Sequence, residues 1–170
     1  MPHYPIQTNK ILNNFFNFYI KDVLAVADNM EINLRADNFF GDHLGLQVLS
    51  AEEFDKSHII FLGYAEMIHD NIIHNRRNRV YRFKKPLEAE GITMPKIEIF
   101  EPKPEADISK LRPGIEHISF VVKNYDSFLE ECKQKNISID KVIDMGGSKF
   151  FKTKLIDNVE IEFRNDKLGE

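Results

Sequence analysis

The chain has 170 residues, enough for one domain or two small fused modules, and a hydrophobic content of 42% excludes an intrinsically disordered protein. The net charge of −4 argues against a general nucleic-acid binder, which needs an excess of Lys and Arg. The single cysteine, Cys132, excludes an internal disulfide and a Cys-rich zinc site. The sequence shows neither a signal-peptide layout nor an apolar span of membrane length, so we expect a cytoplasmic protein that does not enter a membrane.

The first predicted element is an amphipathic helix over residues 9–29. Its apolar side chains recur at the spacing of one helical face, and Thr8 is a suitable N-cap. Asn residues, rather than Lys and Arg, populate the polar face, which favours a helix docked on the domain over a helix on a membrane surface. We therefore predict that residues 1–38 form an N-terminal segment packed on the domain.

Residues 39–103 form the first predicted module, in the order strand, helix and three strands. Alternating apolar and polar residues indicate the strands, and Ser50 as N-cap and Gly63 as terminator bound the helix. The predicted segments are 42–49, 50–63, 65–74, 79–87 and 94–101, with a turn at 75–78.

A Pro- and charge-rich connector, assigned to residues 104–113, leads into a second predicted module, residues 114–170, in which the same order returns. The predicted segments are a strand at 114–122, a helix at 124–136 and strands at 137–145, 148–156 and 159–164.

The repeat is also visible residue by residue. DHLGLQV (42–48) aligns with EHISFVV (116–122), and IEIF (97–100) aligns with IEFR (161–164). Such repetition predicts an α+β fold in which two βαβββ modules pair by pseudo-twofold symmetry into one curved, cup-like mixed sheet.

Strand alternation places two histidines and two glutamates on the sheet face that the helices leave open. His43 and His117 stand in the first strand of each module, and Glu98 and Glu162 stand in the last. Buried carboxylates are costly to keep charged, and a divalent cation (Zn, Ni, Co, Mn or Fe) would supply the compensating charge. The alternative is that both glutamates are solvated and both histidines are structural.

This doubled plan, with His in the first strand and Glu in the last strand of each module, resembles the vicinal oxygen chelate superfamily over residues 40–166. EIFEP (98–102) looks like the end of the superfamily's first module, and GIEHISFVV (114–122) looks like the opening of its second. The sequence is most similar to the YecM-type branch, whose members are regarded as metal-binding enzymes. The resemblance implies one divalent metal ion held by His43, Glu98, His117 and Glu162, with Glu160 as the alternative to Glu162.

The resemblance further implies a metal-dependent isomerase, epimerase or lyase that stabilises an enolate of a small, oxygenated, anionic substrate. Glu162 or Glu98 would move the proton, and the residues do not decide between them. Gln47 and Ser119 share the open face with the histidines and are expected to neighbour the substrate. The alternative function is a non-catalytic small-molecule-binding module of the same fold, and either protein would be a monomer or a homodimer.

The basic stretch over residues 76–85 has three interpretations. Its Arg and Lys residues are interleaved with Tyr81 and Phe83. The stretch is consistent with a solvated hairpin, with a clamp in which Arg79 and Arg82 bind a substrate carboxylate or phosphate, or with a surface for single-stranded nucleic acid. The acidic net charge makes the nucleic-acid interpretation the weakest of the three.

Overall fold

The computed structural model describes residues 4–73, 75–111 and 114–170. Residues 1–3 of the predicted N-terminal segment, His74 in a predicted strand and residues 112–113 of the predicted connector lie outside the described residues. In the described part of the chain, no helix combines the length and the hydropathy that are needed to cross a bilayer.

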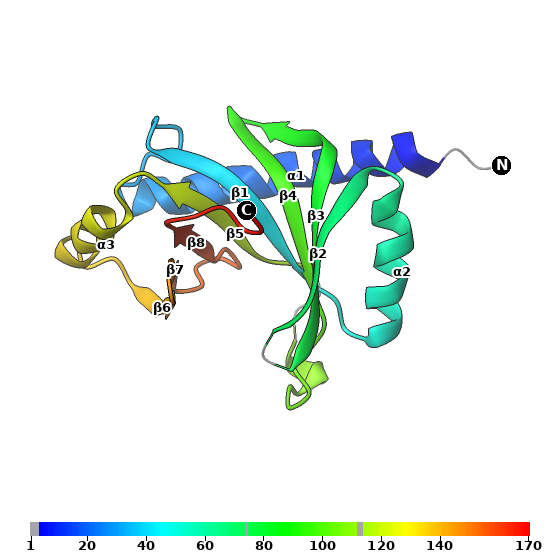
Figure 1. Ribbon diagram of the computed structural model, residues 1–170. Helices are drawn as coiled ribbons and strands as arrows, with labels where there is room; N and C mark the ends of the chain where they lie inside the picture. Colours follow the sequence, from blue (N-terminus) through cyan, green and yellow to red (C-terminus); the bar gives the residue numbers. More distant parts are fainter. Residues whose placement is uncertain (1–3, 74, 112–113) are drawn as a thin grey trace.

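The α-helices of the described chain pack against one central sheet (Figure 1). They are α1 (Tyr4–Asn29), α2 (Ala51–Leu62) and α3 (Tyr125–Gln134). The short 3-10 helix η1 (Ile108–Lys110) lies in the predicted connector and contains no buried residue. The predicted start of the first helix is wrong, since α1 begins at Tyr4 and contains Thr8, and Pro5 is tolerated in its first turn, where its missing N–H costs no hydrogen bond. Ser50 caps α2 as predicted, because its side chain accepts a hydrogen bond from the Glu53 backbone N–H.

One mixed sheet contains eight strands in the described residues, in the order β2-β3-β4-β1-β5-β8-β7-β6. The strands are β1 (Phe39–Gln47), β2 (Ala65–Ile73), β3 (Arg76–Ala89), β4 (Ile92–Phe100), β5 (Gly114–Val122), β6 (Ile139–Met145), β7 (Ser148–Thr153) and β8 (Ile161–Arg164). β1 and β5 pair antiparallel, and each also pairs parallel with the last strand of its own module, β4 or β8. The α+β class and the curved mixed sheet are confirmed.

The register of the β1–β5 pair follows the sequence repeat. His43 is opposite Ser119, and Gly45 is opposite His117. In the repeat, His43 corresponds to His117 and Gly45 corresponds to Ser119. A twofold axis between the two strands therefore maps the His43–Ser119 pair onto the His117–Gly45 pair. The two histidines therefore meet at the centre of the sheet.

One turn differs from the prediction. The turn expected at 75–78 is wrong, because β3 already begins at Arg76. β3 then pairs with β4 through a two-residue turn at Glu90 and Gly91, whose φ angles of 53° and 79° suit a tight hairpin. This long hairpin accommodates the residues by which the first module exceeds the second.

Strand alternation divides the molecule into an apolar side and a polar side. Helix residues such as Phe16, Phe54 and Phe128 share one buried core with strand residues such as Leu44 and Phe163. The opposite face, which we call the cup, carries buried polar and charged side chains. Among them are Asp42, His43, Asn78, Lys96, His117, Ser119, Glu162 and Arg164. Buried polar groups need partners, and these side chains find them in one another.

Candidate metal centre

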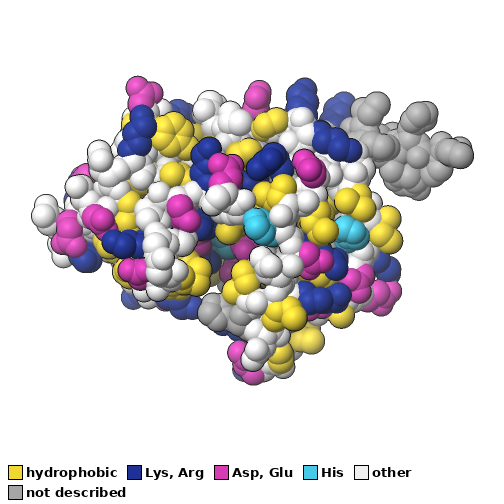
Figure 2. All heavy atoms as spheres, viewed as in Figure 1, with side chains coloured by type: hydrophobic (Ala, Val, Ile, Leu, Met, Phe, Trp, Pro, Cys, Tyr) yellow, Lys and Arg dark blue, Asp and Glu magenta, His cyan; other side chains and the backbone are white. Residues whose placement is uncertain are grey.

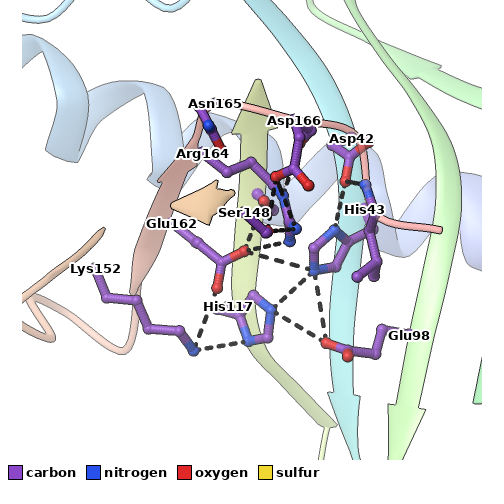
Figure 3. A network of polar contacts seen from close by, with 12 residues as sticks. Asp42, His43, Glu98, His117, Ser148, Lys152, Glu162, Arg164, Asn165 and Asp166 are labelled. Atoms are coloured by element: carbon purple, nitrogen blue, oxygen red, sulfur yellow. Dashed lines mark hydrogen bonds and ion pairs between the residues drawn. The ribbon is translucent and has the colours of Figure 1, made fainter. Parts of the chain in front are cut away.

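The four predicted ligand residues meet in the middle of the cup (Figure 3). His43 of β1 and His117 of β5 bring their Nε2 atoms within 3.1 Å. Glu98 Oε2 of β4 lies 3.6 Å from each of these nitrogens, and Glu162 Oε1 of β8 lies 3.9 Å from His43 Nε2. Glu98 is the most accessible of the four, with a side chain 13% exposed. The structure thus joins donors from both modules.

His43 is oriented by a neighbouring carboxylate. Its Nδ1 lies 2.8 Å from Asp42 Oδ2, and Asp42 Oδ1 lies 2.8 Å from the buried Lys96 Nζ. A register shift of β1 between Gly41 and His43 lets the adjacent Asp42 and His43 side chains lie on the same face. Because a carboxylate accepts hydrogen bonds, His43 donates from Nδ1 and turns Nε2 towards the centre of the cup.

His117 is fixed by close packing and by charged neighbours. Its ring lies over Gly45, where an added Cβ would be 2.1 Å from His117 Cε1, so only glycine fits at this position. Phe100 lies nearly parallel to the imidazole, with ring centroids 6.1 Å apart. His117 Nδ1 lies 3.3 Å from Lys152 Nζ and 3.7 Å from Glu116 Oε1. These contacts leave Nε2 directed at His43.

The two glutamates have different partners. Asn78 Nδ2 donates to Glu98 Oε1 at 2.6 Å, which leaves Oε2 facing the histidines. Glu162 Oε1 accepts hydrogen bonds from Ser119 Oγ at 3.0 Å and from Arg164 Nη1 at 3.2 Å. Glu162 is therefore held by a cationic donor, whereas Glu98 is held by a neutral amide.

These contacts shift the proton affinities in the cup. Burial alone would lower the pKa of His43, but its hydrogen bond with Asp42 and its contact with the Glu98 carboxylate outweigh burial and raise that pKa to about 9. Burial would raise the pKa of Glu98, but contacts with His43 and His117 outweigh it and hold the pKa below its ordinary value. The pKa of Glu162 is lowered despite burial, because both imidazoles favour its charged form. Ionised carboxylates thus face a His43 imidazole that tends to keep its proton.

The donor set fits a divalent cation. Metal–ligand bonds of about 2.1 Å separate adjacent ligand atoms by about 3.0–3.4 Å. The imidazole nitrogens, 3.1 Å apart, already have this separation, and the carboxylate oxygens lie slightly farther away, at 3.6 and 3.9 Å. His43, His117 and Glu162 offer ligand atoms that all lie within 4.8 Å of one another. A cation would replace the positive charge that His43 otherwise carries as a proton.

The alternative ligand Glu160 belongs to a neighbouring group. Glu116, His117 and Glu160 also offer ligand atoms within 4.8 Å of one another. Lys152 Nζ, however, lies 2.9 Å from Glu160 Oε1 and 3.7 Å from Glu116 Oε1, so an ammonium group already compensates these carboxylates. Glu162, unlike Glu160, offers an oxygen within 4.8 Å of ligand atoms of both His43 and His117, which favours Glu162 as the fourth ligand.

The predicted substrate neighbours have different surroundings. Ser119 lies in the centre, where it donates to Glu162. Gln47 is buried farther along β1, opposite Phe100 and Gly114, and its role stays a prediction. Arg82 is opposite Lys96 and shares the cup face with it.

Arg79 lies on the other face of β3, contrary to the prediction that it binds substrate. Its guanidinium lies 4.4 Å from the ring centroid of Phe54 in α2, and its Nε lies 3.0 Å from Asp70 Oδ2. Strand alternation is the reason, because Arg79 and Arg82 are three residues apart and so point to opposite faces.

The basic stretch 76–85 is divided in the same way. Arg77 lies over Phe54 on the helix side, whereas Arg76 lies 4.1 Å above Phe100 in the cup. Figure 2 shows acidic and basic side chains interleaved across the viewed face. A surface for nucleic acid would gather basic side chains on one face, whereas β3 divides Arg76 and Arg77 between two faces.

Four residues that shape the cup were not singled out from the sequence: Asp42, Asn78, Lys96 and Lys152. Asp42 had a visible signal, because an acidic residue precedes both histidines of the repeat. Lys96 reads as a solvent-facing residue, since lysine is almost never fully buried unless it is paired. Asn78 and Lys152 have no local signal, because long-range strand pairing alone brings them to Glu98 and Glu162.

Known proteins place the chain in a family. The family model described as YecM protein matches residues 7–167. The chain belongs to the YecM family. No curated protein matches the sequence.

The YecM-family chain shares its fold with several solved structures. A chain described as "Structural Genomics, Protein EC4020" has a TM-score of 0.74 at 14% identity, covering 99% of this chain and 93% of that one. Methylmalonyl-CoA epimerase from Mycobacterium tuberculosis has a TM-score of 0.56 at 18% identity, covering 74% and 86%. Hydroxyglutarate synthase from Oryza sativa, in complex with 2-oxoadipate, has a TM-score of 0.62 at 11% identity, covering 96% and 82%. These structures confirm the predicted fold, in which two modules form one curved mixed sheet.

Proposed function

We propose that this YecM-family chain is a metal-dependent enzyme that acts on a small, oxygenated, anionic substrate by isomerase, epimerase or lyase chemistry. The main support is the meeting of four donor side chains from four strands, with two imidazole Nε2 atoms 3.1 Å apart. Buried charged groups are costly unless a partner compensates them. A cation held by His43, Glu98, His117 and Glu162 would be that partner.

When bound, the divalent cation supplies Lewis-acid stabilisation of negative charge on substrate oxygens. The protein supplies orientation. Asp42 fixes the His43 ring, and Gly45 leaves room for the His117 ring. Ser119 donates to Glu162, so that this carboxylate keeps one position.

Glu98 is the carboxylate that we assign to proton transfer. Its side chain is the most exposed of the four, and its Oε1 accepts a hydrogen bond from the neutral amide of Asn78. Glu162 accepts from the Arg164 guanidinium, which stabilises its charged form and reduces its basicity. A base must reach the substrate, and Glu98, the more exposed of the two carboxylates, meets this condition better.

The substrate class is supported by the fold relatives. One is an epimerase, and another was solved with 2-oxoadipate, a dicarboxylic oxo acid. Both are properties of those proteins, and for this chain they favour a small acid with an acidic C–H bond.

Metal binding is the first test. The protein is dialysed against Zn²⁺, Ni²⁺, Co²⁺ or Mn²⁺, and bound metal is measured by elemental analysis. We expect stoichiometric metal in the wild type and none in a His43→Ala, His117→Ala double variant. His58→Ala is the matched control, since His58 contacts the Tyr81 hydroxyl on the α2 side of the sheet.

Two results would contradict the proposal. Wild-type protein that cannot be loaded with any of these ions would leave a non-catalytic binding module as the better account.

The role of Glu98 is tested in loaded protein by following exchange of the α-protons of small oxo acids with deuterium, by NMR. Exchange in Glu98→Gln as fast as in the wild type would refute that role.

A further inference from the structure

The segment 165–170, which we call the tail, crosses one end of the cup (Figure 1). Leu168 donates its N–H to Asp42 Oδ2 at 3.1 Å, and its carbonyl accepts from Lys96 Nζ at 2.7 Å. The Gly169 carbonyl accepts from His69 Nε2 at 3.2 Å. Gly169 has a φ of 77°, and a Cβ there would lie 2.6 Å from His69 Cδ2, so this position suits glycine alone. These contacts fix the position of the tail on the cup.

In this position, the tail places the Glu170 carboxylate near three cationic side chains. Glu170 Oε1 lies 3.8 Å from both Arg82 Nη2 and Lys96 Nζ, and Glu170 Oε2 lies 3.2 Å from Lys167 Nζ. The Lys96 side chain is only 2% exposed, so its ammonium group cannot be satisfied by bulk water. A cavity of about 170 Å³ adjoins these groups. Its apolar walls include Phe40, Pro95 and Val121.

The charges around this cavity do not balance without the Glu170 carboxylate. Asp42 faces Lys96, and Glu170 faces all three cations. If Glu170 leaves, Asp42 alone opposes Arg82, Lys96 and Lys167. An incoming anion would then gain charge-assisted hydrogen bonds from an ammonium that is already desolvated.

The cavity is coupled to the metal centre through two contacts. Asp42 contacts both Lys96 and His43: its Oδ1 lies 2.8 Å from Lys96 Nζ, and its Oδ2 lies 2.8 Å from His43 Nδ1. Lys96 and Glu98 are two residues apart on the cup face of β4, which separates them by about 7 Å. A small molecule of a few carbon atoms spans that distance.

We propose that Arg82, Lys96 and Lys167 form an anion subsite for a carboxylate or phosphate group, occupied in this structure by the Glu170 carboxylate. Binding of the anion displaces the Glu170 carboxylate, whereas residues 165–168 of the tail, with Lys167, stay in place. The identification of this anion as part of the substrate rests on the proposed function, whereas the subsite itself does not require a metal. The same small acid would reach the metal centre with its oxygens and the subsite with its anionic group.

The test is a titration of metal-free protein with inorganic phosphate and, separately, with acetate, at constant ionic strength. Backbone amide shifts of Leu168 and Gly169 report the tail by NMR. We expect saturable shifts with one of the two anions, about tenfold weaker binding in Arg82→Gln, and several-fold tighter binding in Glu170→Gln, which removes the competing carboxylate. Lys56→Gln is the control of equal charge change, because Lys56 pairs with Glu52 on α2.

The direction in which Glu170→Gln changes the affinity for the anion distinguishes this proposal from a purely structural role of the tail. A residue that only stabilised the fold would not strengthen anion binding when it is neutralised. Unchanged affinity in Glu170→Gln, or equal weakening in Arg82→Gln and Lys56→Gln, would overturn the subsite, as would the absence of saturable shifts with both anions. Metal loading is measured on the same samples, so failure of the metal centre and failure of the subsite are recorded independently.

Discussion

Replacing Gly45 by alanine should displace the proposed metal ligand His117 without changing the histidine itself. The new Cβ would lie 2.1 Å from His117 Cε1 and 2.5 Å from its Nε2, whereas ordinary contacts begin at 3.4 Å. The ring must therefore retreat by roughly 1.3 Å, several times the ±0.2 Å or so that metal–ligand bonds tolerate. Overpacking of this kind costs about 1–3 kcal/mol, which lowers the melting temperature by roughly 2–12 °C in a chain of this size.

For the metal, we expect Gly45→Ala to lose at least about 100-fold in affinity, because a misplaced ligand costs more than a lost outer-shell partner. Equilibrium dialysis with elemental analysis measures the affinity, and thermal unfolding measures the stability. Gly63→Ala is the control, since Gly63 has a φ of −64° and its nearest atom to a new Cβ is the Ile60 carbonyl oxygen at 3.3 Å. Wild-type metal affinity in Gly45→Ala would refute the role of His117 as a ligand held over Gly45.

Three further predictions follow from single contacts. Asn78→Ala should weaken metal binding by about 10–100-fold in dialysis, because Glu98 loses the donor that orients it. The hydrogen bond from Arg77 holds the pKa of Glu101 below its usual range, so its stabilising effect is complete above the unfolded-state pKa and is lost as the pH falls. Urea unfolding at pH 6 and pH 3 should therefore show a smaller pH effect in Glu101→Gln. Burial raises the pKa of the Cys132 thiol to about 12, so Ellman's reagent at pH 8 should label native protein roughly 10³-fold more slowly than unfolded protein.

Each of these three predictions has a result that would contradict it. Asn71→Ala removes the exposed amide opposite Asn78 on β2, and an equal loss of metal affinity in both variants would remove the case for Asn78. Identical pH effects in the wild type and Glu101→Gln would show that the Arg77 contact adds no stability. Rapid labelling of native Cys132 would contradict its burial in α3.

Much of the fold follows from local patterns in the sequence. The alternation in 114–122 predicted a strand that coincides with β5, and Ser50 marked the start of α2 because its hydroxyl satisfies a free backbone N–H. The turn at 75–78 was misplaced, because Asn and Arg residues that favour a turn are drawn into β3 by pairing with β2 and β4. Local preference is weak there, and the sheet overrides it.

The sequence by itself determined the module order, the repeat and the four side chains that share one face. These features depend on periodicity and on internal similarity, which are properties of neighbouring residues. The tertiary structure alone decided that Asn78 orients Glu98, that Arg79 turns away from the cup and that the tail carries Glu170 to Lys96. Those contacts join segments far apart in the chain, and their geometry depends on the register between strands, which no local pattern specifies.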